Sequence, residues 1–165
     1  MKKNILTIVI PALLIICTAA FFYKRYKIPP AIDLPVMALT DLSGNMVSLS
    51  KYSGHPLFLS FFATWCGPCM RELPELADLQ SKLSGQRLQI ICISDESIDK
   101  LKLLQYQLGD RLTILHSEGK FHDIGIYTYP TNYIFNANGK KVYDKVEPDD
   151  WESEVVVNNV KSLIQ

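Results

Sequence analysis

Residues 61–69, an apolar run that ends in the pair Cys66 and Cys69, constrain the fold of this chain more than any other stretch. The run belongs to a near-continuous apolar segment at 56–62, which predicts a buried parallel strand. Apolar residues at helical spacing follow the pair up to residue 83 and predict a helix. The two cysteines therefore lie where a strand gives way to a helix, and their spacing allows a small disulfide ring to close.

A sulfur atom at the start of a helix is chemically activated. Unpaired N–H groups and the positive end of the helix dipole face Cys66 and stabilise its thiolate, which is the reactive form. Pro68 suits the first helical turn, where its missing N–H costs nothing, and Gly67 keeps the approach to the sulfur open. We therefore expect Cys66 to be the exposed, attacking sulfur and Cys69 to be the shielded, resolving sulfur of a thiol–disulfide exchange site.

A Cys-x-x-Cys pair also has two simpler interpretations, half of a zinc site and a purely structural disulfide. A zinc site needs a second pair of ligands. Cys17 lies in an apolar run and Cys92 in a strand-like run, and neither has a partner at ligand spacing. The three histidines are scattered at His55, His116 and His122. We therefore expect no metal site and interpret Cys92 as a small buried hydrophobe, while a structural disulfide stays the alternative.

Length and composition limit the classes of function. The 165 residues allow one domain with a proper core. Lys and Arg together number 17, as do Asp and Glu, so no basic excess indicates a nucleic-acid partner. Four cysteines with only one close pair argue against a small fold held together by disulfides. No cofactor is expected.

The sequence Trp-Cys-Gly-Pro-Cys at 65–69 is similar to the active-site signature of the thioredoxin superfamily. The longer string FATWCGPCMRELP at 62–74 resembles the TlpA/ResA branch, whose members are extracytoplasmic, membrane-tethered thiol–disulfide oxidoreductases. The resemblance extends from about residue 32 to the C-terminus. It implies protein disulfides as substrates and a membrane electron donor of the thiol-relay type.

The resemblance also implies roles for residues outside the cysteine pair. Tyr129 and Pro130 match the family's cis-proline loop, which faces the cysteines and offers an edge to the backbone of a substrate. Trp65 would cover one side of the site, with simple packing as the alternative. The residues expected to contact substrate are Trp65, Gly67, Pro68, Tyr129 and Pro130.

Glu72 is the candidate for proton transfer. It follows Cys69 by three residues and matches a carboxylate that tunes the cysteine pKa and moves protons in this branch. A solvated helix face is the alternative interpretation. Thioredoxin itself carries a buried Asp six residues before its first cysteine, whereas this chain has Ser60 there. Either Glu72 or water must then accept the proton.

The N-terminus predicts a membrane segment. Residues 5–23 are uncharged and mostly apolar, which is long enough to cross a bilayer as a helix. Three interpretations compete: an uncleaved signal anchor, a signal peptide cleaved near Thr18 and Ala20, and a lipoprotein modified at Cys17. The length of the run favours the anchor, and Ile16 disfavours lipidation. We predict a signal anchor at 1–27, a Pro-rich linker at 28–35 and a thioredoxin-like domain at 36–165.

Basic residues flank the apolar run in similar numbers on both sides, so the positive-inside rule does not decide the orientation of the segment in the membrane. The resemblance therefore decides the orientation. It implies a single-pass protein of the cell membrane, with its catalytic domain on the extracytoplasmic, periplasmic side.

The remaining patterns predict an α/β domain. A hairpin is expected at 37–49, strands at 88–93 and 112–115, a helix at 98–108, and a second hairpin at 133–146 through Asn138 and Gly139. A final helix, capped by Asp149 or Asp150, is expected to reach residue 163. The resemblance implies a thioredoxin-like three-layer fold with a central mixed sheet. The N-terminal hairpin and a helix and strand inserted between 95 and 117 match the branch.

The leading hypothesis for function is reduction of disulfides in exported proteins, which in this family often means the haem-site thiols of apocytochrome c. A Gly-Pro dipeptide between the cysteines resembles reducing thioredoxins more than the oxidising members, whose oxidase or isomerase action is the first alternative. Copper-delivery proteins of this fold use Cys-x-x-x-Cys and a distant His, a longer spacing than here. A thiol peroxidase is disfavoured because the proline that precedes the peroxidase motif is absent near Thr64.

Overall fold

The computed structural model describes residues 11, 15, 16, 18 and 37–165. The chain divides into two units, Met1–Ala31 and Ile32–Gln165. Apart from four helical positions, the predicted anchor at 1–27 and the linker at 28–35 lie outside the described residues, so both stay predictions. Within the described part of the chain, no helix is long and apolar enough to span a membrane.

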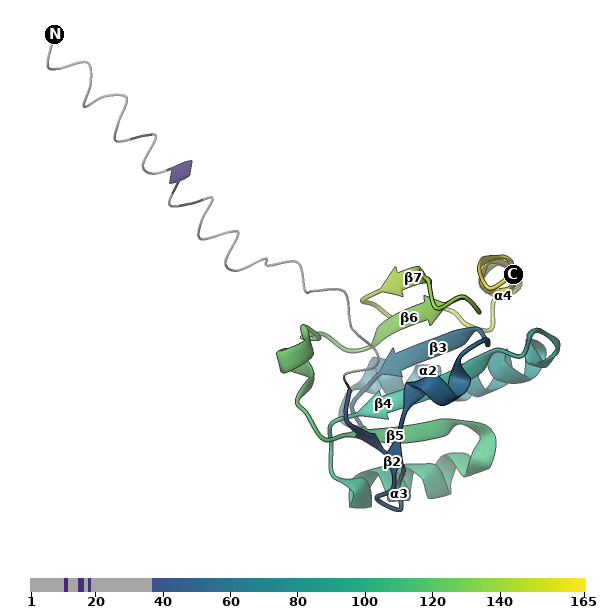
Figure 1. Cartoon of the computed structure of the whole chain (residues 1–165), viewed down its shortest axis with the longest axis horizontal. Helices are drawn as coiled ribbons and strands as arrows, with labels where there is room; N and C mark the ends of the chain where they lie inside the picture. Colours follow the sequence, from purple (N-terminus) through teal and green to yellow (C-terminus); the bar gives the residue numbers. More distant parts are fainter. Residues whose placement is uncertain (1–10, 12–14, 17, 19–36) are drawn as a thin grey trace, which may run out of the picture. The chain divides into compact units, whose positions relative to one another are not determined.

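The folded domain alternates strands with helices along most of its length (Figure 1). The strands are β1 Leu39–Thr40, β2 Met46–Val47, β3 Leu57–Phe61, β4 Gln89–Ser94, β5 Thr113–Ser117, β6 Thr131–Phe135 and β7 Lys141–Lys145. The α-helices are α2 Gly67–Lys82, α3 Ile98–Leu108 and α4 Glu154–Leu163. The 3₁₀ helices are η2 Leu49–Tyr52, η3 Ser84–Gln86, η4 Gly109–Arg111 and η5 Phe121–Ile124.

The seven strands form one mixed sheet in the order β2-β1-β5-β4-β3-β6-β7. The three central strands β3, β4 and β5 are parallel, and every other pairing is antiparallel. All five residues of β3 are buried, as its unbroken apolar run predicts for a parallel strand in the middle of a sheet. The mixed sheet and the N-terminal hairpin are therefore confirmed, and β5 of the expected insertion lies between β4 and β1.

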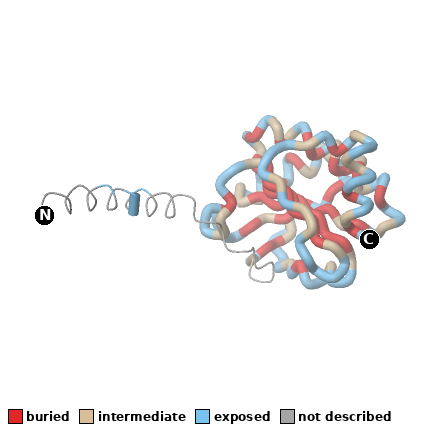
Figure 2. Tube along the Cα trace, turned by 90° about the horizontal axis from the view of Figure 1, so that it is seen from above, coloured by how far each residue is buried: buried red, intermediate tan, exposed pale blue. Residues whose placement is uncertain are grey.

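Side chains of the sheet alternate between two hydrophobic clusters. Phe58, Ile90 and Ile134 face the cluster that contains the buried side of α2, α3 and α4. Leu59 and Ile91 face the other cluster, which is closed by residues of η2 and η5. The predicted three layers are present, but one outer layer is built from 3₁₀ helices. Figure 2 shows buried residues running through the middle of the domain.

The start of the last helix differs from the prediction. Helix α4 begins at Glu154 with Ser153 at its N-cap, several residues after Asp149 and Asp150. The Asp149 carboxylate accepts a hydrogen bond from the Tyr143 hydroxyl at 2.8 Å, so it does not cap the helix. The segment between β7 and α4 is thereby longer than expected and carries Trp151, which is completely buried.

Phe58 tests the packing between the sheet and this segment. Its ring is fully buried and meets the Trp151 ring edge-on, with 4.9 Å between centroids. We expect Phe58→Ala to lower the free energy of unfolding by about 3 to 5 kcal/mol, because it removes apolar contacts and leaves a cavity. Tyr106→Ala, at a position 87% exposed, should change it by less than about 0.5 kcal/mol. Equal effects in denaturant titrations would contradict this packing.

Candidate active site

Cys66 and Cys69 lie at the carboxyl end of β3, where α2 begins. Cys66 is the N-cap of α2, with an extended backbone, and its Sγ accepts a hydrogen bond from the Cys69 N–H at 3.2 Å. The two residues form a disulfide with 5.3 Å between their Cα atoms. The first turn of α2 contains no acidic residue, so no carboxylate there offsets the positive end of the helix dipole at Cys66. The predicted position at a helix N-terminus is confirmed.

Both cysteines are buried in the disulfide form, so the expected exposure of Cys66 is not found in this form. Cys66 is 6% exposed and Cys69 is 2% exposed, so only a small part of Cys66 faces a partner, while Cys69 is shielded as expected. Gly67 is exposed, and a Cβ added there would meet only the Arg71 guanidinium at 4.0 Å. Pro68 lies in the first turn of α2, as expected. A partner therefore reaches the sulfur of Cys66 from the start of the helix, where Gly67 has no side chain to cover it.

The residues expected to bind substrate gather at this end of the sheet. The Tyr129–Pro130 peptide bond is cis, as the resemblance implied. Thr131, which follows it, pairs with Phe61 at the end of β3, so the loop lies beside the strand that leads to the cysteines. Trp65 is 70% exposed, and its ring meets the Tyr129 ring edge-on at 5.6 Å between centroids. Two aromatic rings and the cis-proline thus border the redox pair.

Glu72 is buried, and the interpretation of a solvated helix face is wrong. It is 3% exposed on the same side of α2 as Cys69. Its Oε1 accepts hydrogen bonds from the Trp151 Nε1–H at 2.7 Å and from the Asp149 backbone N–H at 2.8 Å. Burial raises the pKa of Glu72, and these two N–H donors together with the nearby Asn132 amide oppose that effect without cancelling it.

The sheet below Glu72 carries a short polar row. Ser60 on β3 pairs with Cys92 on β4 and with Asn132 on β6, and all three side chains are buried. Burial, and secondarily the charge of Glu72, raises the pKa of the Cys92 thiol to about 12. Cys92 is therefore a protonated, packed thiol. Glu72 Oε2 and both polar atoms of the Asn132 side chain have no hydrogen-bonding partner among the described residues.

Sequence reasoning missed a second carboxylate, Glu96, which follows β4 at the same edge of the sheet. Its two oxygens accept hydrogen bonds from the Thr64 N–H and the Thr64 hydroxyl, and Lys100 pairs with it at 3.3 Å. Burial raises the pKa of Glu96, but these hydrogen bonds outweigh it and the pKa lies below its ordinary value. An acidic residue just after a parallel strand, at the edge that carries Cys66, was the available signal. Glu96 fixes the loop that leads to the cysteine.

Trp151 was also missed. It lies 79 residues after Glu72 in the sequence, and its burial is not indicated by any periodic pattern around it. The only available signal was general: a buried indole usually finds an acceptor for its N–H.

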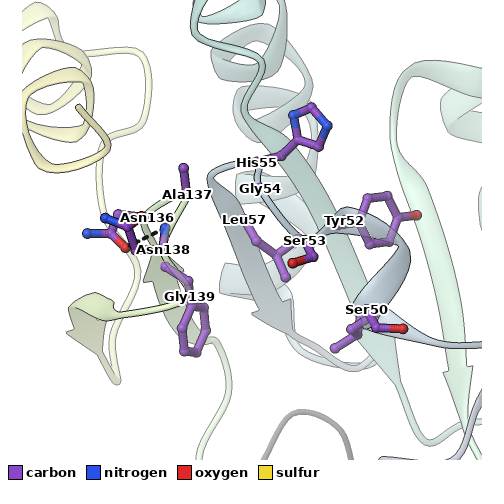
Figure 3. A pocket seen from close by; sticks show the side chains of 12 residues that line it. Ser50, Tyr52, Ser53, Gly54, His55, Leu57, Asn136, Ala137, Asn138 and Gly139 are labelled. Atoms are coloured by element: carbon purple, nitrogen blue, oxygen red, sulfur yellow. Dashed lines mark hydrogen bonds between the residues drawn. The ribbon is translucent and has the colours of Figure 1, made fainter.

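The domain is hollowed at both ends of β3. One hollow, about 510 Å³, is lined by Leu57 at the start of β3 and so lies at the opposite end of that strand from Cys66. Figure 3 shows the side chains that line it. It is lined on one side by the η2 segment, including Tyr52 and Ser53, and on the other by the turn 136–139. Another, about 290 Å³, is lined by Thr64 and Met70 beside the cysteines and by residues of α3. Within the described part of the chain, no group of three or more His, Cys, Asp or Glu residues could hold a metal ion.

Comparisons with known proteins agree with this geometry. Residues 30–143 match the model of the AhpC/TSA family. The chain is 30% identical over 152 residues to thiol-disulfide oxidoreductase ResA of Bacillus anthracis, covering 86% of this chain and 88% of that protein.

Solved structures share the fold. A thiol:disulfide interchange protein of Chlorobium tepidum TLS has a TM-score of 0.64 at 20% identity, covering 82% of this chain and 99% of that one. A thioredoxin-like protein of Porphyromonas gingivalis has a TM-score of 0.65 at 27% identity, covering 81% and 92%.

The position of Cys66 predicts the order in which the reduced cysteines react. We expect an alkylating agent to modify Cys66 first, because the start of α2 stabilises its thiolate, whereas Cys69 lies within the first turn. Mass spectrometry of peptides at short reaction times gives the order. Buried Cys92 serves as an internal control that stays unmodified while the protein is folded. Faster modification of Cys69 than of Cys66 would reverse the roles assigned here.

Proposed function

Because the chain belongs to the AhpC/TSA family and resembles the ResA thiol-disulfide oxidoreductases over most of its length, we propose that this oxidoreductase reduces disulfide bonds of exported proteins. The observation that carries the proposal is the Cys66–Cys69 disulfide at the N-terminus of α2, bordered by the cis-proline loop. A strand edge and two aromatic rings beside a redox pair suit an extended polypeptide better than a small molecule.

The reaction proceeds by two exchanges. The thiolate of reduced Cys66 attacks one sulfur of the partner's disulfide, that S–S bond breaks, and the partner's other sulfur leaves as a thiolate that takes up a proton. Cys69 then loses its proton and attacks the Cys66 sulfur of the mixed disulfide. The second partner sulfur leaves, and the Cys66–Cys69 disulfide forms. Two electrons have passed from the cysteine pair to the partner.

Glu72 supplies a proton acceptor for the second step. Cys69 and Glu72 lie three residues apart on the buried side of α2, and Ser60 replaces the acid that thioredoxin has beneath its cysteines. A carboxylate with a raised pKa takes up a proton nearer to neutral pH than an exposed one does. In the proposed reaction Glu72 accepts the Cys69 proton and returns it to a leaving thiolate.

In this proposal the domain lies outside the cytoplasm and is attached to the membrane by a single-pass anchor at 1–27. A dithiol protein of the membrane supplies the electrons that reduce the Cys66–Cys69 disulfide. The apolar run at 5–23 and the resemblance to the TlpA/ResA branch support this placement. The disulfide of an apocytochrome c haem site is the proposed substrate, and the Gly67–Pro68 dipeptide favours reductase over oxidase or isomerase action.

Trapping tests the proposed function. Reduced Cys69→Ala is mixed with a synthetic peptide that holds a Cys-x-x-Cys-His sequence as a disulfide, the chemistry of a haem attachment site. We expect a covalent one-to-one adduct at Cys66, because the resolving sulfur is absent. Cys66→Ala is the matched control and should give no adduct. No adduct with either variant, or an equal amount with both, would contradict the proposal.

Glu72→Gln should shift the pH profile of disulfide reduction while the fold stays intact, because the amide fills the same space but cannot take up a proton. The expected change in rate is about tenfold, the low end for a general acid–base group. Glu147→Gln, which changes an exposed carboxylate, is the control and should leave the profile unchanged. Stopped-flow rates of Glu72→Gln and parent that superimpose from about pH 5 to 9 would remove Glu72 from the reaction.

The anchor predicts where the full chain is found in cells. After lysis and centrifugation we expect the full-length protein in the membrane fraction, because residues 5–23 are apolar and long enough to span a bilayer. Protease added to spheroplasts, whose cytoplasmic membrane is intact, should digest the domain, while a cytoplasmic control protein should stay intact. Full-length protein in the soluble cytoplasmic fraction would contradict the placement.

A further inference from the structure

We propose that Trp151 is a positioning residue for Glu72: its indole N–H, together with the Asp149 backbone N–H, holds one carboxylate oxygen and leaves the other free to take up a proton. The inference rests on the proposed function, in which Glu72 moves the Cys69 proton. It adds the segment between β7 and α4 to the machinery of the site.

The two N–H donors converge on a single atom of Glu72. The Trp151 Nε1–H and the Asp149 N–H lie 2.7 Å and 2.8 Å from Oε1. Oε2 is equally buried but has no hydrogen-bonding partner among the described residues. The nearby Asn132 amide also lowers the pKa of Glu72 but forms no hydrogen bond with Oε2 in this geometry. The carboxyl group is therefore asymmetric, because fixed donors hold Oε1 and Oε2 is available to a proton.

Trp151 is itself held so that its N–H cannot turn away. The ring is completely buried and meets Phe58 at 4.9 Å and Tyr143 at 6.0 Å between centroids, both edge-on. Its backbone N–H donates to Glu75 Oε2 at 3.3 Å, which ties the same residue to α2 a second time. Rotation of the ring would break these contacts, so the direction of the N–H follows from the packing of the core.

Other titratable groups face Glu72 from three sides. The charge of Glu75 on α2 raises the pKa of Glu72, and the charge of Glu72 raises the pKa of the Cys92 thiol on β4. On the β7 side, the charge of Glu72 also contributes to the raised pKa of Tyr143. The Asp149 carboxylate binds Tyr143 and Lys145 instead, so Asp149 presents only its N–H to Glu72.

The described residues give Glu72 no ion pair. The charged form therefore depends on the N–H donors. Loss of the indole N–H disfavours the carboxylate and raises the pKa of Glu72 further.

The first test compares the pH profiles of disulfide reduction by full-length Trp151→Phe and parent. Phe keeps an aromatic ring and removes the N–H, so the midpoint that belongs to Glu72 should move upward by about one pH unit. Tyr143→Phe is the matched control, because it removes a hydroxyl that binds Asp149 and leaves the indole N–H in place. A profile of Trp151→Phe that superimposes on the parent profile, at whatever stability, would overturn the proposal.

The second test keeps Trp151 and needs no catalysis. In a Trp65→Phe background, Trp151 is the remaining tryptophan of the chain. Its fluorescence should then titrate with Glu72, and the titration should disappear when Glu72→Gln is added. Fluorescence whose pH dependence is the same with and without Glu72→Gln would overturn the positioning role. If the fluorescence titration disappears in Glu72→Gln but the pH profile of its disulfide reduction matches the parent profile, the proposed proton transfer by Glu72 is wrong. The contact between Trp151 and Glu72 then stands.

Discussion

A buried carboxylate without a cation is costly, and among the described residues Glu72 is 3% exposed and has no ion pair. Burial raises the pKa of Glu72 in the folded protein above the ordinary value of 4.5. The stability linked to its protonated form is therefore fully present below about pH 4.5, and it is lost as the pH rises through the pKa of Glu72 in the folded protein. Two N–H donors from the segment before α4 reduce the cost. Both donors belong to the segment between β7 and α4, in which Trp151 is completely buried.

Two carboxylates near the redox pair have opposite environments. Glu72 follows Cys69 by three residues on the buried side of α2 and has a raised pKa, which suits the proposed proton transfer. Glu96 has a lowered pKa, and both of its oxygens hold Thr64, which suits a fixed negative charge that orients the loop before Cys66. Environments that push two pKa values apart are typical of carboxylates with different roles, and in the proposed function Glu72 moves a proton while Glu96 positions the chain.

Most features that depend on neighbours along the chain could be predicted from the sequence, although the start of α4 could not. The apolar run of β3, the spacing in α2, the position of Cys66 at a helix start and the Asn138–Gly139 turn all follow from local rules, and the resemblance supplied the cis bond before Pro130. The contact of Trp151 with Glu72 joins residues 79 apart, and that of Glu96 with Thr64 joins residues 32 apart. A single sequence does not show which residues pair over such separations, although an acidic residue just after β4 indicated the edge of the sheet at which Glu96 lies. The anchor at 1–27 stays a prediction.

If the Cys66–Cys69 pair donates electrons to exported proteins, its reduction potential must be low. Equilibration of the pair with glutathione buffers at pH 7, followed by separation of the reduced and oxidised forms, measures that potential directly. We expect a value near that of thioredoxin, about −270 mV, and in any case below about −200 mV. A value near about −120 mV, as in a strong protein oxidant, would contradict reduction as the function of this site.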